Sequence, residues 1–172
     1  MANEQMQMSA AGMAILRRRE HAVLRYYNDV ANNCTFGVGT LAHHGPCTPA
    51  ELQRLVTAVE VNVQLQTRVN TAARAVRRRV RNRQLTQEQF DALVSFTFDT
   101  GPTGARHVLD AANTGADARV VQQMQRNIYV HPRDANGRRP SPVRIPGLAN
   151  RRREEVVPFQ ALPAVRPPAA RQ

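Results

Sequence analysis

The 172-residue sequence contains no tryptophan, and aromatic residues make up only 5% of it. Hydrophobic residues still reach 42%, so we expect a folded core built mainly from valine, leucine and alanine with a few phenylalanines. A chain of this length suits one domain and can bury most of the surface that it exposes when extended.

Cysteine is also scarce, because Cys34 and Cys47 are the only two and cannot form a disulfide-rich scaffold. They could pair in an oxidising compartment, but two free thiols are the expectation. The spacing of the cysteines and histidines matches neither Cys-x-x-Cys nor His-Glu-x-x-His, the common zinc-binding patterns. We therefore expect no metal site and no cofactor.

Long apolar runs are missing, and none approaches the roughly 18 residues needed to span a bilayer. The first fourteen residues do not form a secretory signal, because Glu4, Gln5 and Gln7 interrupt them. We therefore expect a soluble product of the cytoplasm that would need another route for any later export. Residues 1–8 should form a flexible polar tail, and the Pro-rich residues 160–172 a disordered one.

Acidic residues are outnumbered, with 13 Asp and Glu against 24 Lys and Arg, which gives a formal net charge of +11. All 24 of these basic residues are arginines, and such a chain is attracted to nucleic acid, anionic lipid and the acidic polymers of a bacterial envelope. The arginine-rich segment 76–83 and the basic loop 131–146 could grip phosphates. Neither carries an aromatic stacking platform or a known nucleic-acid motif, so nucleic-acid binding is only the alternative function.

Helix-start signals are clear at three places. Ser9 can cap a helix that runs to about Arg19 or His21, and Thr48 is followed by proline and then by Glu51 in capping-box spacing. A second capping box over 86–89 begins a helix that ends at the Gly-Pro pair 101–102. Further helices are expected at about 69–81, 105–112, 116–129 and 148–157.

One small β element is expected near the N-terminus. Residues 28–40 are rich in Asn, Asp and Gly and predict a turn followed by a short strand or hairpin. The alternating apolar residues from Val59 to Leu65 are also compatible with a strand. Residues 131–146 predict an irregular basic loop. The sequence thus predicts a mostly helical α+β fold.

Glycosidic hydrolysis needs a carboxylic acid that protonates the leaving oxygen and a second group that handles the attacking water. Glu20 follows the first expected helix, Asp29 lies in the turn, and Thr35 begins the expected strand. A helix end followed by a turn and a hairpin can place such groups on two walls. Each residue alone is unremarkable, so their spacing has to carry the hypothesis.

That spacing resembles the T4-type phage lysozymes and endolysins, the muramidases of glycoside hydrolase family 24. The family carries Glu, then Asp nine residues later, then Thr six residues after that, before a Gly-containing strand, as Glu20, Asp29 and Thr35 do here. Residues 8–20 resemble its N-terminal helix, residues 85–98 its core helix, and residues 147–154 its closing motif. The resemblance spans about residues 8–159.

The resemblance implies a lysozyme-like fold over residues 9–159, with a small N-terminal β-hairpin element and a helical C-terminal lobe. It implies cleavage of the β-1,4 bond between N-acetylmuramic acid and N-acetylglucosamine. Glu20 matches the general acid, Asp29 the carboxylate that positions water, and Thr35 the hydroxyl that helps to hold it. Arg151 aligns with an arginine that approaches the acid.

Contacts with substrate are implied for Phe36, Gly37, Val38 and Asp99. The implied partner is bacterial peptidoglycan, approached by a monomer whose basic surface could also meet anionic envelope polymers or the outer membrane. An endolysin would wait in the host cytoplasm until a holin opens the membrane; a virion-associated lysin or an injected effector are the other routes.

The sequence departs from the family pattern at several positions. Thr40, a supporting residue in this assignment, stands where the family has histidine, and His43 or His44 could take its place. Asp99 replaces a common asparagine, and the usual late tryptophan is missing from residues 125–128. A lytic transglycosylase of the same fold remains an alternative, although Asp29 favours hydrolysis. A catalytically inactive relative is disfavoured because all three candidate residues are present.

Overall fold

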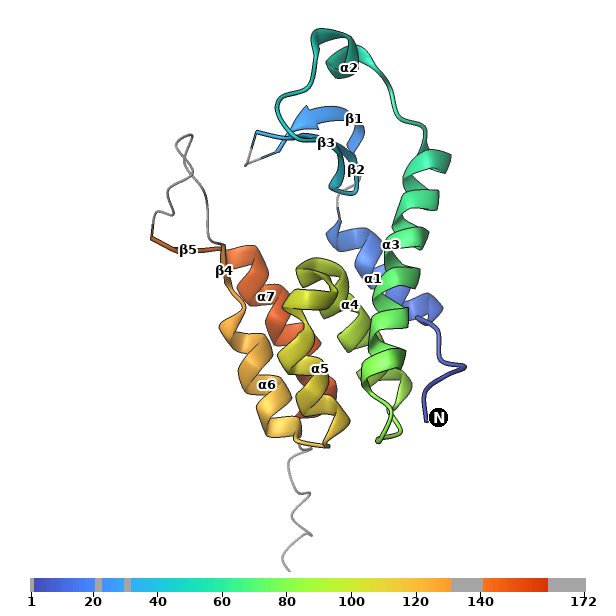
Figure 1. Ribbon diagram of the computed structural model, residues 1–172, viewed down its shortest axis with the longest axis vertical. Coiled ribbons are helices and arrows are strands. Elements are labelled where there is room, and N and C mark those ends of the chain that lie inside the picture. The colour runs from blue at the N-terminus through green and yellow to red at the C-terminus, as the bar shows by residue number, and fades with distance from the viewer. Residues whose placement is uncertain (1, 21–22, 30–31, 131–140, 161–172) are drawn as a thin grey trace, which may run out of the picture.

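The computed structural model describes residues 2–20, 23–29, 32–130 and 141–160. A small sheet lies at one end of the molecule and a group of packed helices at the other, with one long helix running between them (Figure 1). The expected mostly helical α+β fold with an N-terminal β element is confirmed. In chain order the elements are α1 (Ala10–Arg19), β1 (Val23–Asn28), β2 (Cys34–Gly37), β3 (Thr40–His43), α2 (Pro49–Gln53), α3 (Ala58–Arg79), α4 (Gln87–Gly104), α5 (Arg106–Asn113), α6 (Asp117–Arg126), β4 (Tyr129–Val130), β5 (Val143–Arg144), α7 (Pro146–Glu155) and the 3-10 turn η1 (Val157–Phe159).

The sheet is antiparallel, in the order β1-β2-β3. Strand β1 was not expected as a strand, and it pairs Tyr27 with Thr35 on β2. Gly37 ends β2 with a positive φ of 61°, and a Cβ there would lie only 2.9 Å from a side-chain oxygen of Gln64 on α3. Glycine at this position therefore permits both the turn into β3 and the close approach of the sheet to α3.

The strand interpretation of residues 59–65 is wrong, because these residues form the first turns of α3. Thr57 and Glu60 make a capping box that begins the helix. Val61 and Leu65, four residues apart, are buried, whereas Val59 and Val63 are exposed. Of the alternating apolar residues, Val61 and Leu65 are therefore an i, i+4 pair on the core-facing side of a helix.

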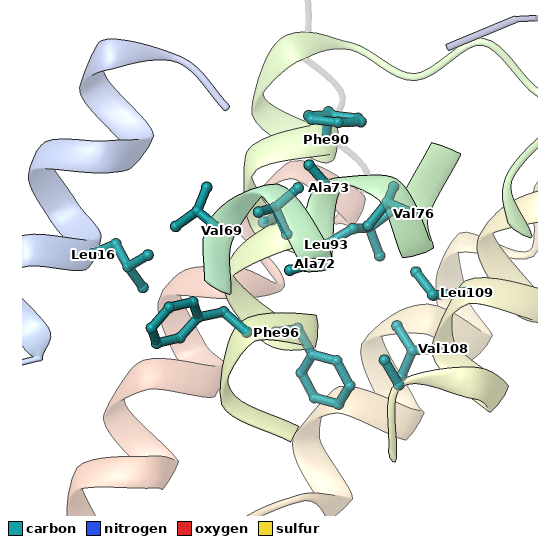
Figure 2. Close-up of a cluster of buried hydrophobic side chains, with 14 of the residues drawn as sticks. Leu16, Val69, Ala72, Ala73, Val76, Phe90, Leu93, Phe96, Val108 and Leu109 are labelled. Carbon is teal, nitrogen blue, oxygen red and sulfur yellow. The ribbon is translucent and has the colours of Figure 1, made fainter. Parts of the chain in front are cut away.

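The core of the helical part is centred on α4, which is buried from Ala92 to Phe98 without a break. One face of α3 packs on it, and Figure 2 shows Val69, Ala72, Ala73 and Val76 of α3 beside the α4 side chains. The expected aliphatic core with a few phenylalanines is thus observed. Helices α1, α5 and α7 also contact α4, so the elements at both ends of the chain are fixed to one central helix.

Residues 2–8 differ from the expected flexible tail. Asn3 is buried, and its side-chain amide donates hydrogen bonds to the carbonyls of Val80 and Arg83, each at 2.8 Å. Its side-chain oxygen accepts from the backbone N–H of Leu85 at 3.0 Å. Sequence composition could not predict that this segment packs on the protein, because the packing depends on one side chain. That side chain provides hydrogen-bond partners for backbone groups in the turn between α3 and α4.

The expectation of free thiols is also wrong, since Cys34 and Cys47 form a disulfide across 13 residues. The bond joins the first residue of β2 to the loop before α2. Both cysteines are buried, and their backbone N–H groups donate to Gly45 and Asn28 respectively. Sequence spacing could not reveal this, because two half-cystines pair only if the chain brings their Cα atoms together, here to 4.5 Å.

The basic loop expected at 131–146 lies mostly outside the described residues. Its described flanks form the β4–β5 pair, and α7 begins at Pro146. Apart from Gln160, the expected tail 160–172 also lies outside them. Within the described ranges, no helix combines the length and the apolar character required to cross a membrane.

Candidate active site

Glu20 is placed by the end of α1. Its backbone N–H donates to the carbonyl of Leu16 at 3.0 Å and so caps the helix, and Leu16 itself is fully buried. The Glu20 side chain is 16% exposed, and its Oε1 accepts a hydrogen bond from Nη1 of Arg151 at 2.9 Å. The structure therefore brings together the first candidate residue and the arginine that was expected beside it.

Arg151 is held on every side by groups other than Glu20. Its Nε donates to Oε1 of Glu155 at 3.0 Å, its Nη2 donates to the backbone carbonyl of Ser95 at 2.9 Å, and it pairs with Asp99 at 3.3 Å. Burial lowers the pKa of Arg151, but the charges of Asp99, Glu155 and Glu20 outweigh burial and raise it. The guanidinium is thus a fixed, permanent cation against Glu20.

Arg152 and Glu155 were not among the expected site residues. Both are almost completely buried, they pair with each other, and Arg152 also binds Asp99 and lies over the ring of Phe96 at 4.5 Å. Arg151, Arg152 and Glu155 of α7 and Asp99 of α4 thus form a closed ring of four ion pairs. Their i, i+3 spacing on one helix was the available sequence signal, since residues three apart share a face.

Asp29 and Thr35 form the second group. Thr35 is buried on β2, and its hydroxyl donates to Oδ2 of Asp29 at 3.3 Å. The other carboxylate oxygen of Asp29 accepts from the backbone N–H of Asn33 at 2.9 Å. The turn between β1 and β2 therefore orients the carboxylate toward the threonine.

Tyr27 connects the two groups electrostatically. Its pKa is raised by burial and then by the negative charge of Asp29, with a smaller contribution from Glu20, while Arg68 acts in the opposite direction. Both candidate carboxylates therefore act on one phenol at the end of β1. The arrangement offers a carboxyl group fixed by a cation and a carboxylate–hydroxyl pair that can hold a water, which suits acid-assisted hydrolysis.

The residues expected to contact substrate on β2 and the following turn are largely packed within the protein. Phe36 stacks on Tyr26 with ring centroids 4.7 Å apart, and the side chain of Val38 is buried. Gly37 is buried at the close approach to α3. The hydroxyl of Thr40, opposite Phe36 in the sheet, is buried and makes no hydrogen bond within the described part of the chain.

Arg68 is a second cation that the sequence analysis missed. From α3 it donates to the backbone carbonyl of Val38, and its guanidinium lies 4.2 Å from the ring centre of Phe98 on α4. Burial lowers its pKa, against the opposing effects of Glu20 and Asp99. It lies mid-helix among polar neighbours, so only the tertiary structure reveals its role in joining the sheet to the helices.

Two hollows share Asp99 and Thr100 in their walls. One, of about 340 Å³, lies between α3 and α4 and includes Arg68 and Phe98. The other, of about 560 Å³, is walled by α4, α6 and the start of α7 and includes Tyr129 and Leu148. Asp99 was expected as a substrate contact, and it lies where the two hollows meet.

The arginine-rich segment 76–83 is largely engaged within the protein. Arg79 pairs with Asp110, Arg83 pairs with Asp117, and Arg77 donates to the carbonyl of Met6. Three of its arginines therefore help to fix α5, α6 and the N-terminal segment. This packing gives the charge run a structural role that does not require nucleic acid.

Comparison with known proteins shows which family this chain resembles in sequence and structure. A family model described as "Phage lysozyme" matches residues 17–155, whereas no curated protein sequence matches. Among solved structures, the endolysin of Escherichia coli O157:H7 phage FAHEc1 is similar at 28% identity and a TM-score of 0.71, over 90% of this chain and 94% of that one. The muramidase domain of SpmX from Asticaccaulis excentricus is similar at 25% identity and a TM-score of 0.70, over 92% and 100%. A mutant of P22 lysozyme is similar at 26% identity and a TM-score of 0.62, over 90% and 99%.

Proposed function

Because the chain belongs to the phage lysozyme family and is a lysozyme-type peptidoglycan hydrolase, we propose that Glu20 is its general acid. Asp29 and Thr35 would hold the attacking water. The observation that carries this assignment is the hydrogen bond of 2.9 Å from Arg151 to Glu20, which fixes one carboxyl group beside the separate Asp29–Thr35 pair. The bond cleaved is the β-1,4 linkage between N-acetylmuramic acid and N-acetylglucosamine.

In the proposed reaction, Glu20 gives its proton to the glycosidic oxygen as the carbon–oxygen bond breaks. Water held by Asp29 and Thr35 attacks the anomeric carbon from the opposite face and transfers a proton to Asp29. The configuration at the anomeric carbon is therefore inverted in the product. Asp99, between the two hollows, would contact the glycan strand.

Clearing of purified peptidoglycan tests the assignment of the acid. We expect the wild type to clear a suspension and Glu20→Gln to lose at least about a hundredfold in rate, since general acid catalysis contributes roughly 10²–10⁴-fold. Glu154→Gln is the matched control, because Glu154 is an exposed glutamate that also pairs with an arginine. Equal clearing by the wild type and Glu20→Gln would reject the site.

The product ends distinguish hydrolysis from the transglycosylase alternative. A hydrolase releases N-acetylmuramic acid with a reducing end, whereas a transglycosylase forms an anhydro sugar because the sugar's own hydroxyl attacks. Mass spectrometry of the wild-type digest should show reducing ends, and Asp29→Ala should be strongly impaired. Full activity of Asp29→Ala with anhydro ends would establish the alternative.

The substrate also accounts for the net charge of +11. Peptidoglycan and the polymers attached to it carry negative charge, and a cationic enzyme is attracted to them over about a Debye length. The association should therefore weaken as salt is raised. We propose that the enzyme acts on the cell wall as a monomer.

A further inference from the structure

A cluster of metal-binding side chains lies at the far end of the sheet from α3. One ligand atom each of Cys34, His43 and Glu51 lie within 4.8 Å of one another. Cys47 is not one of these three residues, but its sulfur is bonded to that of Cys34 and so adjoins the group. Three residues from β2, β3 and α2 therefore converge, with Cys47 of the following loop next to them, although their spacing in the sequence matches no common zinc pattern.

The ring of His43 is oriented as in a typical metal-binding histidine. Its Nδ1 lies 3.0 Å from the carbonyl oxygen of His44, so Nδ1–H donates there. A hydrogen bond from the far ring nitrogen to a carbonyl is the usual means by which proteins fix a zinc-binding imidazole. The other nitrogen, Nε2, faces Oε1 of Glu51 at 3.1 Å.

Both oxygens of Glu51 lie close to Nε2 of His43, at 3.1 and 3.2 Å, and one of them is also fixed by the helix cap. Its Oε2 accepts from the backbone N–H of Thr48 at 2.7 Å and from the Thr48 hydroxyl at 2.8 Å, in the capping box of α2. These bonds hold the carboxylate, whereas Oε1 points to His43. The helix cap thus holds the second ligand next to His43.

Hydrogen bonds also hold the backbones of the two cysteines. The backbone N–H of Cys34 donates to Gly45 at 2.7 Å, and that of Cys47 donates to the side chain of Asn28 at 2.7 Å. A further bond of 3.1 Å joins Gly45 to the side chain of Asn33. These bonds do not involve the sulfur atoms, so we expect them to keep the two cysteines close together after reduction.

We propose that the dithiol form of this protein binds one zinc ion through Cys34, Cys47, His43 and Glu51. Two thiolates, one imidazole and one carboxylate make a set of four ligands suited to tetrahedral Zn²⁺. With bonds of about 2.0–2.3 Å, the ligand atoms would need to lie roughly 3.5 Å apart, which side-chain rotation can reach from the present spacing. The disulfide and the metal exclude each other.

Interconversion of the two forms balances by thiol–disulfide exchange. A low-molecular-weight disulfide oxidises the two zinc-bound thiolates, its own sulfur–sulfur bond breaks to give two thiolates, and Zn²⁺ is released as the Cys34–Cys47 bond forms. A thiol pool reverses the reaction and permits the metal to bind again. The metal form therefore belongs to a reducing compartment and the disulfide form to an oxidising one.

Cobalt substitution tests the proposal on the full chain. After reduction with a phosphine, one equivalent of Co²⁺ should produce thiolate-to-cobalt charge-transfer absorption and the d–d bands of a tetrahedral site, and Zn²⁺ should displace it. The oxidised protein should give neither. His43→Ala should weaken Zn²⁺ binding at least about tenfold, whereas His44→Ala, which keeps the backbone carbonyl, should not.

Three results would overturn the inference: a folded reduced protein that gives no tetrahedral cobalt spectrum, equal cobalt spectra for the two oxidation states, or equal losses in the two histidine variants. If reduction unfolds the sheet, Zn²⁺ should restore the near-ultraviolet circular dichroism, and failure to do so would also refute the site. Glu20→Gln should bind metal normally, so this test is independent of the catalytic assignment.

Discussion

Nη1 of Arg151 lies 2.9 Å from Oε1 of Glu20, so a helix near the end of the chain fixes a side chain at the end of the first helix. The same guanidinium binds Glu155 and the carbonyl of Ser95. Only the planar fork of arginine can reach these partners together, because lysine carries a single nitrogen. The position of Glu20 therefore depends on the shape of the cation as well as on its charge.

Arg151→Lys should for this reason reduce the rate of peptidoglycan clearing by about tenfold to a hundredfold. The estimate corresponds to the loss of one charge-assisted hydrogen bond, worth about 1.5–3 kcal/mol. Arg153→Lys on the exposed face of the same helix is the control. Unchanged clearing by Arg151→Lys would show that charge alone is sufficient.

Arg152→Met should destabilise the protein by about 3–5 kcal/mol, because it leaves the buried carboxylate of Glu155 without its main partner. Arg153→Met should change the free energy of unfolding by less than about 0.5 kcal/mol. Denaturant unfolding measures both. Adding Glu155→Met to Arg152→Met should recover much of the loss, and a double variant no better than the single one would contradict the proposed pairing.

Asn3→Ala should lower the free energy of unfolding by about 1–3 kcal/mol, since it strands the buried carbonyl of Val80 and the N–H of Leu85. The exposed Gln5→Ala provides the comparison. Thermal unfolding of the two variants under the same conditions is sufficient. Equal unfolding temperatures would support the flexible tail that the sequence suggested.

Tyr27 can report on Asp29 through its pKa. Burial and the Asp29 carboxylate both disfavour the phenolate, so the folded protein holds the proton more tightly than the unfolded chain does. This contribution to stability is present below the ordinary tyrosine pKa and is lost as the pH rises through the raised value.

Asp29→Asn should lower the pKa of Tyr27 toward its ordinary value, because one of the charges that raise it is removed. Phenolate absorbance followed against pH would measure the shift, and Tyr27→Phe would identify the contribution of this residue among the three tyrosines. Asp110→Asn, on α5, should leave the titration unchanged. An upward shift in Asp29→Asn would contradict the described electrostatics.

Local signals predicted those parts of the fold that depend on neighbouring residues. Ser9, Thr48 and Thr86 begin helices as expected, because a cap is formed by a side chain and a backbone group within three residues. Strand β1 escaped prediction because only Tyr26 of its six residues is buried, and so it lacks the alternation of a half-buried strand.

The candidate site likewise contains residues that the sequence could indicate and residues that only the structure reveals. Glu20, Asp29 and Thr35 could be proposed from the sequence because they occur close together in it with the spacing of a known family. Arg68 and Arg152 were missed because their partners lie 30 and 53 residues away and only folding brings them into contact. The disulfide was missed for the same reason.

Arg68 has a consequence for the motion of the enzyme. Its guanidinium contacts both the carbonyl of Val38 in the turn after β2 and the ring of Phe98 in α4. We expect that any movement of the turn after β2 away from α4 would break one of these two contacts. One guanidinium therefore links the turn after β2 to the central helix, so we expect the two to move together as long as both contacts last.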